Sequence, residues 1–245
     1  AIYDDIAYTR GKLISKVIIP LWASAWKSID HAVLLNEYAK KYYQHIKFNG
    51  LSVIPNGRHV TANSKSIPQS DIAVINELKS KYTLLGSVCT LDKRKGLEQI
   101  IPLLKSKPEY AFLVIGDGIE RATLEEMASK NNVASRFKIL GFRADGYRFL
   151  QYLDLFVMPS RSEGMSLSLL EAMALKKPIV CANIPSNLNV LTENEASFFE
   201  LDQPNSLLLA CEKTLRHAEE LKNNAFNRYT KFEIYKVYIV FILCT

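Results

Sequence analysis

From about residue 82 onward, the sequence alternates short, β-branched apolar runs with longer helical segments, and this alternation limits the possible folds more than any other feature. The apolar runs predict strands at residues 83–88, 111–115, 137–140, 155–158 and 179–182, and the segments between them predict helices at residues 97–104, 120–131, 145–152 and 166–176. Continuous apolar runs indicate strands that are buried on both faces, and strand–helix alternation implies right-handed crossovers. The sequence therefore predicts an α/β domain with a doubly wound parallel sheet.

The chemistry of such a domain is expected in its loops, because ligands of doubly wound sheets lie beyond the carboxyl ends of the strands. Four loops follow the predicted strands: residues 89–96, 116–119, 142–145 and 160–166. We expect the candidate site in these loops.

The first 55 or so residues form a different piece. They predict a helix over 12–28, a strand over 32–35, a helix from Glu37 and a strand over 51–54. These elements are too few for a complete α/β domain, and the chain opens without a methionine, so we expect residues 1–57 to be the remainder of a second, partial domain. The polar run 58–70 predicts a linker. Residues 71–220 then form the main domain, and a helix is predicted over 212–238. Residues 221–245 are expected to pack back on the N-terminal piece.

Composition narrows the function classes. The 245 residues are 48% hydrophobic with a net charge of +6, and basic residues are scattered among acidic ones, so nucleic acid is not an expected partner. The four cysteines lie far apart without metal-ligand spacing, which predicts no metal site and a reducing, cytoplasmic location. No apolar run approaches the roughly 20 residues of a membrane span. Contact with the inner face of the membrane stays open.

Two carboxylates flank the start of the predicted helix at residue 166. Glu163 lies in the loop before the helix, and Glu171 lies eight positions later, a separation of up to about 12 Å along a helix. The amino end of a helix favours phosphate or sugar oxygens, and Gly164 allows a ligand to approach the backbone closely. By themselves, two such glutamates are more often solvated surface groups than ligand-binding groups.

The surrounding residues change that balance. The run from Pro159 to Ala174 (PSRSEGMSLSLLEAMA) resembles the PSxxEGxxLxxLEAMA signature of glycosyltransferase family 4, the group 1 glycosyltransferases. Further similarities follow the family's order along nearly the whole chain: the VIPNG run at 53–57, Lys95-Gly96, the IGDG turn at 115–118, Gly141-Phe142 and the DLFV run at 154–157. The resemblance implies a GT-B type fold, in which two Rossmann-like domains face each other. Residues 1–57 would then be what this chain has of the acceptor domain.

The resemblance also implies roles for individual residues. Glu163 is expected at the donor sugar near the reacting carbon and is the expected catalytic residue. Glu171 is expected to bind the ribose hydroxyls, and Lys95 to neutralise the leaving diphosphate. The other residues expected to bind the donor are Thr90, Arg94, Gly116, Gly118, Phe142, Arg143, Gly164, Met165, Ser166 and Leu167. Members of the family transfer a hexose with retention of configuration and need no metal or other cofactor.

Three positions depart from the family pattern. Asn189 stands near a position where the family often has a glutamate. Thr90 stands where the family has an arginine, so Arg94 or Lys93 would have to supply the second phosphate cation. Lys176 replaces a glycine after the signature helix and removes an easy left-handed cap.

The expected function is transfer of a hexose from a nucleotide diphosphate sugar to a glycan or lipid-linked acceptor in the synthesis of cell-surface polysaccharide such as lipopolysaccharide. Two alternatives stay open: a chain that binds the nucleotide sugar without turnover, and a GT-B nucleotide-sugar epimerase.

Overall fold

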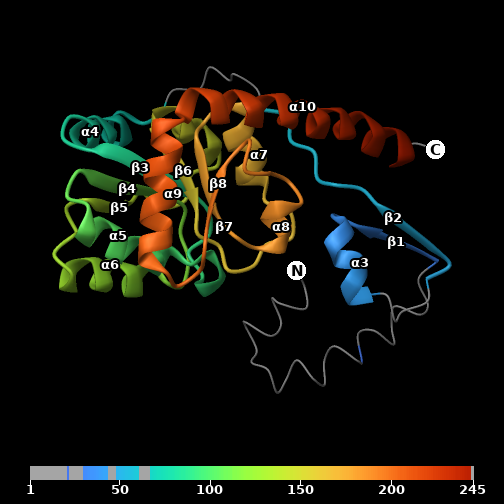
Figure 1. The fold of residues 1–245 in the computed structure, drawn as a ribbon, viewed down its shortest axis with the longest axis horizontal. Coiled ribbons are helices and arrows are strands. Elements are labelled where there is room, and N and C mark those ends of the chain that lie inside the picture. The colour runs from blue at the N-terminus through green and yellow to red at the C-terminus, as the bar shows by residue number, and fades with distance from the viewer. Residues whose placement is uncertain (1–20, 22–29, 44–47, 61–66, 244–245) are drawn as a thin grey trace.

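The computed structural model describes residue 21 and residues 30–43, 48–60 and 67–243. The larger body in Figure 1 is built on a parallel sheet with helices on both faces, and a small unit lies beside it. Among the described residues, none of the helices has both the length and the apolar character that a bilayer crossing needs.

The main sheet has six parallel strands in the order β5-β4-β3-β6-β7-β8. Their bounds are β3 Thr83–Val88, β4 Tyr110–Ile115, β5 Phe137–Ile139, β6 Leu155–Met158, β7 Ile179–Ala182 and β8 Ser197–Phe199. The strand order reverses between β3 and β6, so the loops after these two strands flank the switch point of a doubly wound sheet. The predicted fold class is confirmed, while β8 has no counterpart among the predicted strands.

Helices cover both faces of the sheet, and each face has its own apolar core (Figure 1). One layer comprises α4 (Gln69–Lys79), the 3₁₀ helix η3 (Gly146–Tyr152), α7 (Leu167–Ala174) and α10 (Ala218–Leu243). The other comprises the 3₁₀ helix η2 (Leu97–Gln99), α5 (Ile100–Ser106), α6 (Arg121–Lys130) and α9 (Pro204–Arg216). Short elements η1 (Lys93–Lys95) and α8 (Pro185–Leu188) lie in loops after β3 and β7.

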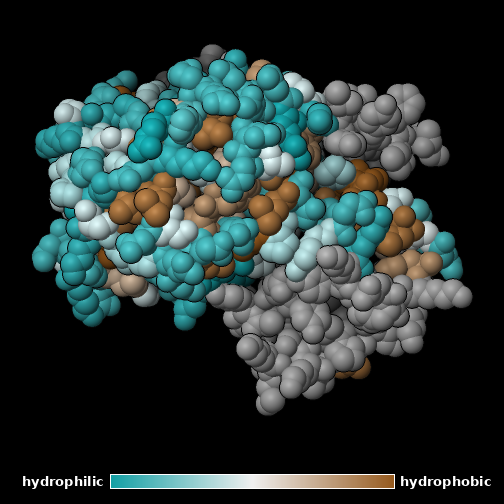
Figure 2. Space-filling view, in the orientation of Figure 1, coloured by the Kyte–Doolittle hydropathy of each residue, from teal (hydrophilic) through white to brown (hydrophobic). Residues whose placement is uncertain are grey.

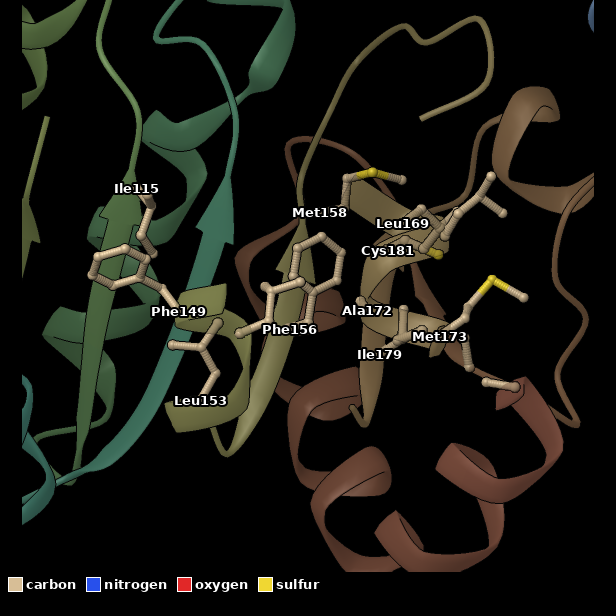
Figure 3. Packing of buried hydrophobic residues seen from close by; sticks show 14 of the residues in the cluster. Ile115, Phe149, Leu153, Phe156, Met158, Leu169, Ala172, Met173, Ile179 and Cys181 are labelled. Atoms are coloured by element: carbon tan, nitrogen blue, oxygen red, sulfur yellow. The ribbon is translucent and has the colours of Figure 1, made fainter. Parts of the chain in front are cut away.

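The side chains of β6 show why these strands are apolar throughout. Phe156 and Met158 pack into the first core, whereas Leu155 and Val157 pack into the second. Figure 3 shows Phe156 between Phe149 of η3 on one side and Ala172 and Ile179 on the other. Full burial of such a side chain contributes about 1.5–3 kcal/mol to the free energy of unfolding. The two cores bury both faces of the sheet and thereby position the loops at the ends of its strands.

Four predicted helices differ from those observed. The helix predicted from residue 97 starts with the 3₁₀ helix η2, and the one predicted over 145–152 is the 3₁₀ helix η3 throughout. The helix predicted over 212–238 is wrong as one element, because the chain leaves helical geometry at His217 between α9 and α10. The helix predicted to end at residue 176 ends at Ala174, and Lys176 takes the left-handed conformation (φ 52°) of a helix cap.

The small unit consists of β1 (His31–Leu34), α3 (Glu37–Tyr43) and β2 (Gly50–Val53), with the two strands parallel. Both strands begin and end one residue earlier than predicted. A parallel pair joined by a helix is the repeating unit of Rossmann-like domains, in agreement with the predicted partial second domain. The helix predicted over 12–28 lies outside the described residues.

The segment between the two bodies differs from a simple linker. The helix α4 begins at Gln69, two residues before the predicted domain start, and Arg58 and His59 bond to residues of α7 and α10. The described part of α10 packs along α7. Lys176 joins the two helices, because its ammonium lies 4.5 Å from the centre of the Phe226 ring.

Candidate functional site

The switch point of the sheet brings Lys95 and Glu163 together. Lys95 ends η1 in the loop after β3, and Glu163 lies in the loop after β6. The Lys95 Nζ atom lies 2.8 Å from Glu163 Oε1, and the Ser160 hydroxyl donates to the same oxygen at 2.7 Å. Both charged side chains are largely buried, at 15% and 11% exposure. The site therefore contains a compensated cation–carboxylate pair where ligands of such sheets bind.

The two loops that carry this pair are packed back to back. Gly96 adopts a left-handed conformation (φ 63°), and a Cβ atom there would stand 2.2 Å from the carbonyl oxygen of Pro159. The Arg161 N–H donates to the Arg94 carbonyl at 2.7 Å, and the Gln99 amide donates to the Pro159 carbonyl at 3.0 Å. Only glycine fits at residue 96 without displacing these loops, which gives the Lys95-Gly96 motif a structural reason.

Thr90 and Arg94, two of the residues expected to bind the donor, are bonded to Asp92. The Thr90 hydroxyl donates to Asp92 Oδ2 at 3.0 Å, and Arg94 Nη2 lies 3.2 Å from the same oxygen. The other Asp92 oxygen accepts the Arg94 N–H and caps η1. Thr90 thus helps to fold the loop that carries Lys95. Its role toward a donor stays a prediction.

Glycines also fix the loops after β3 and β4. A Cβ on Gly116 would stand 1.8 Å from the carbonyl oxygen of Cys89, and one on Gly118 would stand 2.4 Å from that of Leu91. Burial raises the pKa of the Cys89 thiol to about 12, so it stays protonated beside the ion pair. The glycine turn at 116–118 lets two loop backbones approach each other. This account explains the glycines without a ligand, and their expected part in donor binding stays a prediction.

Phe142 and Arg143 lie in the loop after β5. Their environments differ. Phe142 is 74% exposed, which leaves its ring free to contact a ligand. The Arg143 guanidinium instead holds the buried Asp71 of α4 with two bonds of 2.7 and 2.8 Å. Arg143 therefore fastens α4 to the body of the domain. Any contact with a donor would come in addition to this role.

The start of α7 is held from the small unit by two asparagines. The Asn36 amide, after β1, donates to the Gly164 carbonyl at 3.0 Å, and the Asn56 amide, after β2, donates to the Met165 carbonyl at 3.2 Å. Because C=O and N–H point in opposite directions across a trans peptide, these bonds turn the N–H groups of the following residues away from the small unit. Ser166 caps α7 by accepting the Leu169 N–H, and Leu167 begins the helix with 44% exposure.

Glu171 lies within α7, eight residues after Glu163, and its side chain is buried. Its Oε1 atom lies 2.7 Å from Arg58 Nη2. Burial raises the pKa of Glu171, whereas the charge and hydrogen bond of Arg58 lower it. The buried carboxylate thus has one described cation as its partner.

The structure brings most of the predicted residues to one edge of the sheet, and it adds four that the sequence analysis missed. Asn36, Asn56, Arg58 and Ser160 all bond to the residues around Glu163 and Glu171. Asn36 and Asn56 follow strand ends, which is the signal that could have identified them. Arg58 directly follows the PNG run, but it was assigned to the linker because its neighbours are polar.

Two further observations concern possible ligands. A cavity of about 340 Å³ lies beside the site, lined by Asp92, Lys93, Leu97, Glu98, Glu120, Thr123, Leu124, Met127 and Arg161. Its described lining includes Lys93, one of the two candidates for the second phosphate cation, and none of the other residues expected to bind the donor. In the part of the chain that the structure describes, no cluster of three or more His, Cys, Asp or Glu side chains could hold a metal ion.

The fold is that of an α/β domain with a doubly wound parallel sheet, and the candidate site lies at the switch point of that sheet. The family model of group 1 glycosyl transferases matches residues 69–231, so the chain belongs to this family. It is 29% identical over 210 residues to the O-antigen biosynthesis glycosyltransferase WclY of Escherichia coli, covering 84% of this chain and 58% of that protein. It is 31% identical over 160 residues to an E. coli UDP-Gal:alpha-D-GlcNAc-diphosphoundecaprenol alpha-1,3-galactosyltransferase, covering 62% and 41%. The chain therefore spans only part of the length of these relatives.

Solved structures share the same architecture. The sucrose-phosphate synthase of Thermosynechococcus elongatus matches 94% of this chain and 63% of its own with a TM-score of 0.75 and 17% identity. Anabaena HepE, solved in complex with UDP, matches 88% of this chain and 64% of its own with a TM-score of 0.74 and 18% identity. These likenesses support the GT-B fold.

Proposed function

We propose that this chain binds the nucleotide-sugar donor of a retaining family 4 glycosyltransferase that transfers a hexose to a glycan or lipid-linked acceptor in cell-surface polysaccharide synthesis. The observation that carries the proposal is the Lys95–Glu163 pair at the switch point, beside the amino end of α7. The relatives named for O-antigen synthesis and for a diphosphoundecaprenol acceptor support the acceptor class. UDP in the HepE structure makes UDP the first nucleotide to test.

Each of these residues contacts a different part of the donor in this proposal. Glu171 accepts hydrogen bonds from the ribose hydroxyls, since an ionised carboxylate is an acceptor-only group. Lys95 and the N–H groups at the start of α7 stabilise the charge that develops on the leaving diphosphate. Glu163 lies at the sugar, next to the cation that neutralises the leaving group. The chemistry of these residues requires no metal.

Binding of the nucleotide sugar without transfer is a second candidate, and Thr90 favours it. The position where the family carries an arginine holds a hydroxyl that bonds to Asp92. One phosphate cation fewer would lower the rate of diphosphate departure more than it would lower donor binding. An assay that finds donor binding but no sugar transfer would select this candidate.

A thermal-shift titration with UDP, GDP, ADP and CMP tests the donor site, because a ligand that binds the folded state raises its melting temperature. We expect one nucleotide to raise the melting temperature of the wild-type chain. We expect Glu171→Ala to abolish most of that rise, whereas Glu125→Ala on exposed α6 leaves it unchanged. A cooperative melt that no nucleotide shifts would contradict the proposal.

A further inference from the structure

Arg58 reaches from the segment after β2 to the buried carboxylate of α7. Arg58 Nη2 and Glu171 Oε1 are 2.7 Å apart, with the Glu171 side chain only 9% exposed. A carboxylate in such surroundings loses hydration, which favours its neutral form. Arg58 supplies the positive charge that opposes this effect, and the pKa of Glu171 reflects both influences.

Contacts with α10 and η3 fix the position of Arg58. The Tyr229 hydroxyl of α10 donates to the Arg58 carbonyl, and the guanidinium lies 5.6 Å from the centre of the Tyr147 ring of η3. The next residue, His59, bonds through Nδ1 to Glu233 of α10 at 2.8 Å. With its backbone held by α10 and its guanidinium against the Tyr147 ring, the Arg58 side chain loses less freedom when it bonds to Glu171. The arrangement is therefore a built support and not a chance surface contact.

The bond to Arg58 does not use all the hydrogen-bonding capacity of the Glu171 carboxylate. An ionised carboxylate offers about four acceptor positions, and Arg58 needs one or two of them. The vicinal hydroxyls of a ribose can use the remaining ones. A protonated carboxyl would instead present a donor and lose part of this capacity.

We propose that Arg58 is a positioning residue that keeps Glu171 charged and oriented to accept the ribose hydroxyls of a nucleotide. The inference rests on the proposed function, because it assumes that Glu171 meets the ribose. It also means that the segment after β2, outside residues 69–231 of the family match, takes part in donor recognition.

The other ionisable groups around the pair do not replace Arg58. A phenol carries no positive charge in either protonation state, so Tyr147 and Tyr229 cannot replace the guanidinium, and the imidazole of His59 bonds to Glu233. Removal of Arg58 should therefore raise the pKa of Glu171, so that the carboxylate is lost at a higher pH than in the wild type. Ribose recognition in such a variant should weaken as the pH falls.

The test compares the dissociation constants of UDP and 2′,3′-dideoxy-UDP by isothermal titration at pH 8 and pH 6. The ratio of the two dissociation constants measures the contribution of the ribose hydroxyls to binding, because titration of the phosphates is common to both ligands. We expect the wild type to prefer UDP by about tenfold at both pH values. In Arg58→Gln we expect the ratio to fall below about threefold at pH 8 and further at pH 6.

Three variants serve as controls. His59→Gln removes the neighbouring bond to Glu233 without touching Glu171 and should keep the wild-type ratio at both pH values. Arg58→Lys retains a positive charge and should restore part of the ratio. Arg58→Met keeps a long apolar stem against Tyr147 and takes the place of Arg58→Gln, with the same expected ratios, if that variant does not melt cooperatively.

Two outcomes would overturn the inference, and they are distinguishable. A ratio in Arg58→Gln equal to that of the wild type at both pH values would overturn the role of Arg58 while leaving the donor site intact. A wild-type chain that binds UDP and the dideoxy analogue equally would show that Glu171 does not read the ribose. That outcome would overturn the role of Glu171 in the proposed function as well.

Discussion

Glu163 and Glu171 are the same residue type, eight positions apart in one sequence block, yet the structure supports them in different ways. Glu163 receives Lys95 and Ser160, both from loops of the main sheet. Glu171 receives Arg58, from the segment that follows β2 of the small unit. One carboxylate is thus set by the main domain alone, while the other needs a residue from outside it. The two ends of the candidate donor site should respond differently to changes in the small unit.

The two bodies differ in the hydropathy of the surface that they present in one view. Figure 2 shows hydrophilic residues over most of the main body in this view, with hydrophobic areas near its centre and on the described part of the small unit. On the small unit, Val33, Leu35 and Leu51 are partly exposed. The small unit and the segment that follows it meet the candidate site through polar contacts of Asn36, Asn56 and Arg58.

The largest expected effect is at Glu163. Glu163→Gln keeps the shape of the side chain and removes its charge beside Lys95. If Glu163 acts on the reacting sugar, kcat for sugar transfer should fall by about 10²–10³, with KM for the donor changed much less. Release of nucleoside diphosphate measures both constants.

Glu125→Gln is the matched control for Glu163→Gln. Glu125 lies on exposed α6, pairs with Arg121 and has no contact with the ion pair. This variant should keep wild-type rates. A Glu163→Gln variant with unchanged kcat and a raised KM would show that Glu163 only binds the donor.

The next largest effect separates the two carboxylates. Glu171→Gln should weaken binding of uridine, which carries ribose but no phosphate, by about 10- to 100-fold. Glu163→Gln should leave uridine binding within about twofold, because its charge lies at the other end of the site. Equal losses in the two variants would contradict the division of roles.

The two asparagines of the small unit are expected to have a smaller effect. Asn36→Ala combined with Asn56→Ala removes two bonds to the carbonyls before α7, each worth about 0.5–1.5 kcal/mol. The N–H groups that those carbonyls orient should then bind a diphosphate about tenfold less well, whereas uridine should bind as before.

Titration calorimetry with UDP and uridine measures this difference. Asn183→Ala is the control, because Asn183 bonds to Glu200, away from α7. If the double variant lost uridine and UDP affinity alike, the asparagines would support the whole site and not its phosphate end.

The smallest effect concerns the end of α7 beyond both carboxylates. The left-handed backbone of Lys176 costs about 1 kcal/mol of strain. The contact of its ammonium with the Phe226 ring contributes about 0.5–1 kcal/mol of stability. Lys176→Gly should therefore change the free energy of unfolding by less than about 0.5 kcal/mol.

In a Phe226→Leu background, where the ring interaction is absent, Lys176→Gly should instead stabilise the protein by about 1 kcal/mol. Urea unfolding of the four proteins in this cycle measures the difference. An identical effect of Lys176→Gly in both backgrounds would show that the ring does not offset the strain.

The sequence predicted the main sheet well because its strands are buried on both faces and read as continuous apolar runs. The bounds of β3, β6 and β7 match those predicted, whereas β8 is only three residues long and gave no clear pattern. The break at His217 was missed because α9 and α10 are both helical and no proline or glycine separates them. The 3₁₀ geometry of η3 likewise depends on tertiary packing that no local pattern records.

The site was predictable only as far as its residues lie in loops that follow main-sheet strands. The Lys95 and Glu163 loops meet because β3 and β6 are neighbours at the switch point, which follows from the strand order. The Arg58–Glu171 pair joins residues 113 positions apart, one in the segment between the two bodies and one in the main body, and no sequence periodicity encodes that contact. Arg143 was expected to bind the donor from its place in the sequence, but in the structure it pairs with Asp71.

The most direct test of the account is a titration of uridine, UDP and UDP-glucose into the wild type, Glu163→Gln and Glu171→Gln. We predict that Glu171→Gln loses affinity for all three ligands by a similar factor. Glu163→Gln should keep its affinity for uridine and UDP and lose the part of the affinity that the sugar adds. If Glu163→Gln lost uridine affinity while Glu171→Gln kept it, the assignment of the two carboxylates to opposite ends of the donor would be wrong.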